Sequence, residues 1–486
     1  MPHLLLTALT ASALALATPL TSRNPVKRNE PQYPILTCEA ASWPTTELPK
    51  YITPQLPDAD LQDLISQINP DNIYANIEKL VSFGTRHTLS SQTDPNRGIG
   101  AARSWLKSKY EEYAEASNGR MTVSLEGYEQ QPDGDRVLFP VLIQDVVATL
   151  KGSEEPDRYY LISGHYDSRR SDPNDYEGDA PGADDDASGV AVSLELARVF
   201  ALAPTPPRAT IIFVAVAGEE QNLYGANYLA ETFRNTSRNL AGMLNCDTVG
   251  SYTGDDGYED PHVIRVFAEG PPLTENATVR AQRLSIGGEN DSPARNLARF
   301  IHEVSENEYT EMNVSVIYRL DRFLRGGDHR PFLQNGFSAV RFTEPHEVYE
   351  HQHNDVRVED GVQYGDLIEY VDKDYTARVA RVNAAALWSL SQAPGEPTSV
   401  YVNTTALDND SQFVWSPPVD GDEGVDSYEV VWRPTNAPFW TNSVDVGKTD
   451  SAVVPLSKDN VIFGIRSVRA GYKSPAVLPF PLPVAD

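Results

Sequence analysis

The sequence predicts an α/β protein with a mainly parallel, twisted sheet sandwiched by helices, followed by a small all-β sandwich. Two observations predict this fold class. Short apolar runs alternate with helix-like patterns through the middle of the chain, and such alternation is typical of a parallel sheet covered by helices. The last part of the chain instead has β-patterned pieces separated by Pro and Gly turns, which suits a sandwich.

The composition is that of an ordinary globular protein. The chain has 486 residues, and 40% of them are hydrophobic, which is enough to bury a sizeable core. At roughly 150 residues per domain, this length suggests about three domains, or one large domain with a small companion. There are 40 Lys and Arg against 69 Asp and Glu, which gives a net charge of −29. This excess of acid argues against nucleic-acid binding, which needs clustered cations.

The first residues have the pattern of a secretory signal peptide. Residues 1–17 are almost entirely apolar or small, and Ala15-Leu16-Ala17 supplies the small-x-small pattern read by signal peptidase. A membrane anchor is the alternative, but the apolar run is short for a span, and no second run of about 18 apolar residues follows. We therefore expect a secreted, extracellular protein without a transmembrane anchor.

Sequons and cysteines fit that compartment. Cys38 and Cys246 can pair in an oxidising environment, although two cysteines alone do not establish a disulfide. N-glycans can attach at six Asn-x-Ser/Thr sequons, which are Asn235, Asn276, Asn290, Asn313, Asn403 and Asn409.

The elements that precede the sheet follow from local pattern. Residues 18–69 are polar and rich in Pro, as in a leader, a propiece or an arm on the surface. The α/β domain is expected over residues 70–393. Within it, residues 73–83 and 98–113 predict helices, the second from apolar positions at near-helical spacing, and residues 137–150 are β-like.

Short apolar runs predict the main strands of the sheet. The second of these runs is apolar throughout, as expected for a strand that is buried on both faces. Between the first two runs, apolar residues recur at helical spacing over residues 192–200, after Ser188, which can cap a helix. The four runs are residues 159–162, 211–216, 241–244 and 338–342.

A second domain is expected after a linker-like stretch at residues 392–397. Residues 397–486 contain β-patterned pieces at 413–415, 428–432 and 461–468. With Trp415 early and an Ile-Arg-Ser-Val strand late, this region resembles a fibronectin type III module.

Polar residues able to hold a metal follow each predicted strand. In an open parallel sheet the carboxyl ends of the strands line one crevice, so side chains far apart in sequence meet there. In chain order these residues are His165 and Asp167, then Glu219 and Glu220, then Asp247, and finally His351 and His353.

An acidic loop adds to this set. The octapeptide at residues 182–189 contains Asp184, Asp185 and Asp186 and no Lys or Arg, so a divalent cation would relieve the crowding of charge. Carboxylates together with imidazoles suit zinc, whereas a hard-cation site is more often oxygen-only. Taken one by one, such residues are ordinary solvated side chains, turns or helix starts. Their joint placement at successive strand ends is what predicts a metal site.

These motifs resemble those of the co-catalytic di-zinc exopeptidases. That family includes secreted bacterial leucyl aminopeptidases, glutamate carboxypeptidase, and vacuolar and secreted fungal zinc metalloproteases. The resemblance covers roughly residues 70–390, and the whole chain, with its C-terminal β-module, is most similar to the secreted fungal members. It rests on His165-Tyr166-Asp167, Gly-Ala-Asp-Asp-Asp-Ala-Ser-Gly, Glu219-Glu220, Asp247 and a late His-x-x-x-Asp.

The resemblance implies two zinc ions per chain and a role for each site residue. Glu219 would be the general base, and Asp167 could accept from the other ring nitrogen of His165 and fix its tautomer. The late ligand is His351 by the His-x-x-x-Asp pattern, which ends at Asp355, while His353 is the alternative two residues on. The implied metal ligands are His165, Asp185 as the bridge, Glu220, Asp247 and His351 or His353.

The implied function is hydrolysis of peptide bonds at peptide ends by a water that two zincs activate. We expect an aminopeptidase acting on peptides or proteins. A carboxypeptidase or dipeptidase of the same family, a single-zinc enzyme like the glutaminyl cyclases, and an inactive binding protein whose β-module does the work remain alternatives. Residues 325–332 resemble the family's Asp-His loop beside the substrate pocket, where Arg325 or Arg330 could bind a substrate carboxylate.

Overall fold

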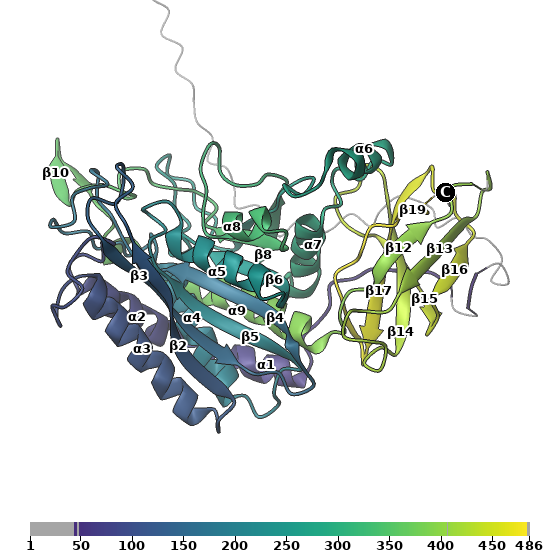
Figure 1. The fold of residues 1–486 in the computed structure, drawn as a ribbon, viewed down its shortest axis with the longest axis horizontal. Helices are drawn as coiled ribbons and strands as arrows, with labels where there is room; N and C mark the ends of the chain where they lie inside the picture. The colour runs from purple at the N-terminus through teal and green to yellow at the C-terminus, as the bar shows by residue number, and fades with distance from the viewer. Residues whose placement is uncertain (1–42, 46–47, 406, 484–486) are drawn as a thin grey trace, which may run out of the picture. The chain divides into compact units, whose positions relative to one another are not determined.

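The computed structural model describes residues 43–45, 48–405 and 407–483. The expected signal peptide at residues 1–17 and Cys38 lie outside the described residues, and Cys246 is a buried free thiol. An eight-stranded sheet with helices on both faces forms the main body (Figure 1). None of the described helices combines the length and the apolar character that crossing a bilayer requires.

The sheet is mixed, with a parallel centre. The four strands β5, β4, β6 and β9 run parallel, β2 and β3 add antiparallel strands at one edge, and β7 is antiparallel to β9 at the other. The predicted fold class and all four predicted strands are therefore confirmed. In spatial order the strands are β2 (Met121–Gln130), β3 (Val141–Leu150), β5 (Ala209–Val216), β4 (Glu155–His165), β6 (Asn239–Cys246), β9 (Ala339–Thr343), β7 (Val263–Phe267) and β8 (Asn313–Ile317).

Helices cover the sheet in two groups. Helices α2, α3, α4 and α9 contact one another on one face, and α5 and α8 cover the other (Figure 1). The helices are α1 (Ala59–Ser66), α2 (Pro70–Val81), α3 (Ile99–Ala116), α4 (Ala187–Leu202), α5 (Tyr224–Asn235), α6 (Ala277–Ser285), α7 (Pro293–Ser305), α8 (His329–Gln334) and α9 (Lys373–Gln392), with a 3₁₀ turn at Ile368–Tyr370 and a hairpin of β10 (Arg357–Glu359) and β11 (Val362–Tyr364).

Helix α4 begins two residues earlier than the sequence suggested. Its N-cap is Asp186, whose carboxylate accepts from the backbone N–H of Gly189 at 2.9 Å, so the expected cap Ser188 lies inside the first turn. A Cβ on Gly189 would come within 2.1 Å of the Cys246 carbonyl oxygen. The glycine thus lets α4 pack closely against β6, and this packing fixes the acidic loop beside the strand ends.

The region expected to be a leader or surface arm is packed in its described part. Helix α1 buries Leu61 and Leu64 in the same apolar core as the sheet. Upstream, β1 (Lys50–Tyr51) pairs with β15 of the C-terminal strands, and Trp43 stacks on Trp432 at 5.7 Å. The core of the main body therefore starts before residue 70.

The C-terminal strands form two sheets with a shared apolar core. The expected sandwich is present, and its resemblance to a fibronectin type III module stays a prediction. One sheet has the order β1-β15-β14-β17-β18 and the other β16-β13-β12-β19. The strands are β12 (Thr398–Val402), β13 (Ser411–Ser416), β14 (Ser427–Pro434), β15 (Asn442–Gly447), β16 (Ser451–Val454), β17 (Val461–Arg469), β18 (Tyr472–Lys473) and β19 (Phe480–Pro481).

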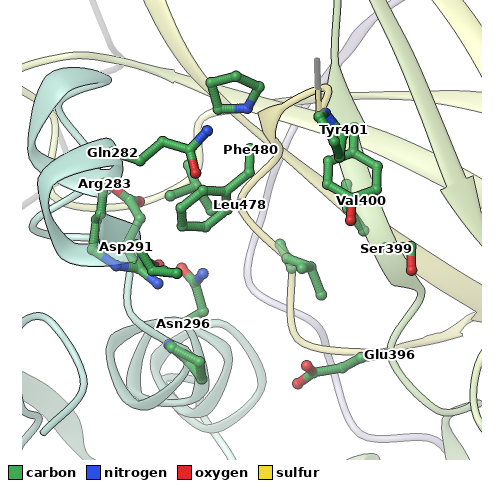
Figure 2. Close-up of a pocket in the computed structure, with 16 residues that line it drawn as sticks. Gln282, Arg283, Asp291, Asn296, Glu396, Ser399, Val400, Tyr401, Leu478 and Phe480 are labelled. Atoms are coloured by element: carbon green, nitrogen blue, oxygen red, sulfur yellow. Dashed lines mark hydrogen bonds between the residues drawn. The ribbon is translucent and has the colours of Figure 1, made fainter. Parts of the chain in front are cut away.

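Buried ion pairs join this β-module to α7 and the loop before it. The Asp291 carboxylate accepts from Arg433 at 2.7 and 3.0 Å, and Arg466 donates to Glu303 at 3.0 and 3.1 Å. Asp291 and Arg466 are almost completely buried. A cavity of about 480 Å³ lies between α6 and the strands β12 and β19, and no candidate site residue lines it (Figure 2).

Candidate metal centre

The strand order brings the predicted ligands to one edge of the sheet. Strand β4 lies between β5 and β6 in the sheet. The chain therefore passes from β4 to β5 on one side of it and then to β6 on the other side. Such a switch point opens a crevice at the carboxyl ends of the strands. His165 is the last residue of β4, Glu219 and Glu220 follow β5, and Asp247 follows β6 directly.

Two groups of three ligand atoms meet at this edge and share Asp185. In the first group, His165 Nε2 lies 3.1 Å from Asp185 Oδ1 and 4.0 Å from Asp247 Oδ1. In the second, His353 Nε2 lies 2.9 Å from Asp185 Oδ2 and 3.1 Å from Glu220 Oε1. Each oxygen of Asp185 thus faces a different imidazole.

In the structure, the late histidine that joins these candidate groups is His353, the alternative, rather than the preferred His351. The His351 ring stacks on Tyr370, with the ring centroids 3.7 Å apart, and belongs to neither group. His353 lies in the left-handed region, with φ 53°, and this backbone turn aims its ring at Asp185. Asp355, which ends the His-x-x-x-Asp pattern that favoured His351, pairs with Arg170, at 2.8 Å, in the loop after β4.

Hydrogen bonds within the chain hold the acidic loop in place. The Asp366 carboxylate accepts from the backbone N–H groups of Asp184, at 2.9 Å, and Asp185, at 2.7 Å. Asp186 Oδ2 accepts from the backbone N–H of His165 at 2.9 Å. The loop that carries Asp185 is therefore attached both to β4 and to the segment before α9.

Asp167 positions its neighbours in two ways. Its carboxylate accepts from the backbone N–H groups of Glu219 and Glu220, both at 3.1 Å, and from Thr88 Oγ1 at 2.8 Å. The expected contact with His165 is made mainly by the backbone carbonyl of Asp167, which lies 3.1 Å from His165 Nδ1, while the nearer carboxylate oxygen is 3.6 Å away. A carbonyl at Nδ1 leaves Nε2 of His165 available to a metal.

Three arginines that sequence reasoning missed surround the centre. Arg169 Nε donates to Glu220 Oε2 at 2.9 Å, and Arg341 Nη2 donates to Asp247 Oδ1 at 2.6 Å. Arg86, which is completely buried, donates to the backbone carbonyls of Tyr166, Pro181 and Gly182. Burial lowers the pKa of Arg86 to about 10. The sequence offered a signal for one of these arginines, because Arg341 places a charge inside the otherwise apolar run that forms β9.

Burial and charge act against each other in this centre. Burial alone would lower the pKa of His165, but the carboxylates of Glu219 and Asp185 help to raise it well above its usual value. Burial would raise the pKa of Asp185, yet His353 and His165 hold it well below its usual range. For Glu219, burial and the neighbouring Glu220 raise the pKa well above normal. The carboxylates outnumber the imidazoles, and a bound cation would balance the excess.

Glu219 lies outside both three-ligand groups and therefore differs from its neighbour Glu220.

The Asp-His loop, residues 325–332, also reaches this region. Asp328 is completely buried, and neither of its carboxylate oxygens has a hydrogen-bond partner among the described residues. Burial raises the pKa of Asp328 to about 8. The guanidinium of Arg325 is occupied by Glu347, at 2.8 Å, and by the side chain of Gln352, at 2.9 Å.

The donor set fits zinc. Carboxylate and imidazole ligands from several elements converge, and Glu220 Oε1 is buried without a hydrogen bond although His353 Nε2 is 3.1 Å away. Lone pairs that face one another in this way are suited to a cation with N and O ligands. A mixed sheet that presents such a group at its carboxyl edge defines an α/β protein with a candidate zinc site at the switch point of the sheet.

Comparison with known proteins agrees with this class. The model of peptidase family M28 matches residues 145–369. A probable zinc metalloprotease of Pyrenophora tritici-repentis is 59% identical over 433 residues, which are 88% of this chain and 98% of that protein. A probable zinc metalloprotease of Phaeosphaeria nodorum is 53% identical over 489 residues, 97% of each chain. The chain therefore belongs to peptidase family M28 and is a zinc metallopeptidase.

Solved structures with a similar arrangement are more distant in sequence. LapB from Legionella pneumophila matches with a TM-score of 0.48 and 19% identity, over 71% of this chain and 78% of that one. A glutaminyl cyclase of Porphyromonas gingivalis matches with a TM-score of 0.44 and 15% identity, over 66% of this chain and 97% of that one.

Proposed function

We propose that this metallopeptidase is a secreted exopeptidase that uses two zinc ions and removes residues from the amino end of peptides. The observation that carries the proposal is the pair of three-ligand groups that share Asp185. A carboxylate has two oxygens and can bridge two cations about 3.5–4 Å apart. A chain that holds one zinc has no need for the second complete group.

Five side chains would hold the metals. His165 and Asp247 would bind one zinc, Glu220 and His353 would bind the other, and Asp185 would bind both. When bound, zinc supplies a Lewis acid that polarises a peptide carbonyl and makes water more acidic. Arg169 and Arg341 orient the Glu220 and Asp247 carboxylates through hydrogen bonds to one oxygen of each.

Glu219 is the general base in this proposal. It follows β5 next to a ligand but contributes to neither ligand group, so its carboxylate is available for proton transfer. Asp167 fixes the Glu219 backbone through the hydrogen bond from its N–H. The Glu219 carboxylate would take a proton from the attacking water and return it to the departing amine.

Three alternative functions give different results in simple assays. A carboxypeptidase or dipeptidase would require a free carboxyl end, a cyclase-like enzyme would hold one zinc, and a binding protein would be inert. We would incubate the enzyme with peptides that carry a free amine and with the same peptides N-blocked, each with and without a chelator. Cleavage of the free-amine peptides alone, lost with chelator and restored by zinc, supports an aminopeptidase. Equal cleavage of N-blocked peptides rules it out.

A further inference from the structure

The loop between β2 and β3, residues 131–140, brings a cation to the edge of the metal centre. Arg136 Nη1 donates a hydrogen bond to the backbone carbonyl of Glu220 at 3.0 Å. Glu220 is a ligand in the second group, and the residue before it is the base Glu219. The guanidinium therefore lies beside the residues that would surround the scissile bond.

This loop is built to present its arginine. One carboxylate oxygen of Asp133 accepts from the backbone N–H groups of Asp135, Arg136 and Val137, at 2.8–2.9 Å. The Tyr224 hydroxyl donates to the other oxygen of Asp133 at 2.6 Å, and the side chain of Val137 is completely buried. The backbone of Arg136 is thus held in place by hydrogen bonds on one side and by core packing on the other.

Arg136 differs from the two other arginines that contact candidate site residues. Arg169 and Arg341 each bind a carboxylate of the centre. Arg136 is half-buried and binds no carboxylate among the described residues, and the same residues offer no acceptor to its Nε or Nη2. Arg325, which the sequence suggested for substrate binding, already has Glu347 as its partner.

The free edge of a guanidinium matches a carboxylate, which can accept two parallel hydrogen bonds from Nε and Nη2. Because Arg136 contacts the backbone of Glu220, which neighbours the proposed base Glu219, the carboxylate that it meets would belong to a residue next to the scissile bond. We propose that Arg136 binds a substrate carboxylate on the leaving-group side, which makes short peptides with a free carboxyl end the preferred substrates. This inference rests on the proposed exopeptidase function and names its substrate class.

The test compares leucyl-alanine with leucyl-alaninamide, using the zinc-loaded full-length enzyme. We expect the wild type to prefer the free acid in kcat/KM. Arg136→Ala should lower kcat/KM for the acid by roughly 10- to 100-fold more than for the amide, because the lost hydrogen bonds go to a charged group that only the acid carries. Arg136→Lys should keep part of the preference. Arg97→Ala, an exposed arginine paired with Asp179, is the matched control and should keep all of it.

A third substrate separates the two sources of a carboxylate. Leucyl-glutamic acid with its α-carboxyl amidated carries the charge only on its side chain, so a preference for it over leucyl-alaninamide that disappears in Arg136→Ala assigns the site to an acidic side chain.

Three results would overturn the proposal. If the wild type cleaves acid and amide equally, and chelator stops both, Arg136 does not bind a carboxylate while the exopeptidase function stands. If the preference disappears in Arg330→Ala and survives in Arg136→Ala, the wrong arginine has been assigned. If no peptide is cleaved by the zinc-loaded enzyme, the proposed function fails and takes this inference with it.

Discussion

Asp185 Oδ2 lies 2.9 Å from His353 Nε2, although the two residues come from loops that follow different strands, β4 and β9. One loop precedes α4 and the other follows β9. Hydrogen bonds to Asp366 and the left-handed backbone of His353 set the two ends of this contact. This contact favours His353 over His351 as the late metal ligand, and separate replacement of the two histidines tests that assignment.

Replacing the two histidines separately should give opposite results. His353→Ala should lower the zinc content from about two to about one per chain and reduce kcat/KM by more than roughly 100-fold, because even residues behind a metal ligand typically cost 10–100-fold. His351→Ala is the matched control and should keep both zincs. Metal analysis after dialysis decides between them, and zinc loss in His351→Ala alone would contradict the assignment.

Changing the proposed base should separate chemistry from metal binding. Because Glu219 belongs to neither ligand group, Glu219→Gln should keep the full zinc content and lower kcat by roughly 10²–10⁴-fold, the range typical of general-base removal. Zinc analysis and steady-state kinetics on one preparation provide the check. Near-wild-type turnover would show that another group takes the proton.

The ion pairs behind the β-module should contribute strongly to stability. Arg466 is 1% exposed and is bound by Glu303 and Glu429. Arg466→Met would remove the cation from Glu303 and leave Glu429 with Lys473 alone, at 3.5 Å, and this should cost about 3–5 kcal/mol in the free energy of unfolding. Denaturant titration measures the loss. Arg97→Ala, in an exposed pair, should change stability by less than about 1 kcal/mol.

A buried acid away from the metal centre should make stability depend on pH. Glu269 is 5% exposed, and burial raises its pKa from 4.5 to about 7. The folded state therefore holds this proton more tightly than the unfolded state. The protonated carboxyl contributes its full stabilisation below pH 4.5, and this stabilisation is lost as the pH rises to about 7. The loss in the free energy of unfolding has an upper bound of about 3 kcal/mol.

Glu269→Gln should remove this dependence. Thermal unfolding of both proteins from pH 4.5 to pH 8 should show wild type losing stability relative to the variant as the pH rises. Parallel curves would mean that Glu269 titrates normally.

Glycan mapping tests the proposed secretion together with the accessibility of each sequon. Asn235, Asn276 and Asn409 are exposed, and their side-chain nitrogens have no described hydrogen-bond acceptor, so we expect glycans there. In contrast, Asn403 Nδ2 donates to the side chain of Gln412 at 3.1 Å, and Asn313 Nδ2 donates to the backbone carbonyl of His262 at 3.2 Å. Mass spectrometry of protein secreted by a eukaryotic host reads each site, and an absence of glycans at all three exposed sites would count against the prediction.

The sequence predicted the parts of the fold that depend on local pattern. The run at 211–216 became the fully buried strand β5 because a strand covered on both faces needs apolar residues throughout. The last two strands of the sheet, β7 and β8, which run antiparallel to its centre, were missed, since strands of five residues have little periodicity. The described part of residues 18–69 looked like a surface arm because its core residues are few and sit among polar ones.

The residues of the candidate site likewise fall into those that the sequence could predict and those that it could not. Residues placed directly after strands, such as His165 and Asp247, could be predicted because strand ends are fixed by the sheet. The choice between His351 and His353 could not, because both lie in an irregular loop where spacing carries no geometric information. The contacts of Arg86, Arg169 and Arg136 join segments distant in sequence, and no local pattern encodes which carbonyl or carboxylate a guanidinium reaches.

Arg86 and Asp366 hold the acidic loop entirely through bonds within the polypeptide, to three carbonyl oxygens and two backbone N–H groups. We therefore expect these bonds to hold the shape of the acidic loop whether or not a metal is bound. Stripping the metal should leave the secondary structure and the cooperative melt intact, and returning zinc should restore activity without a refolding step. Chelation would then act as a reversible off-switch for this enzyme rather than as a denaturant.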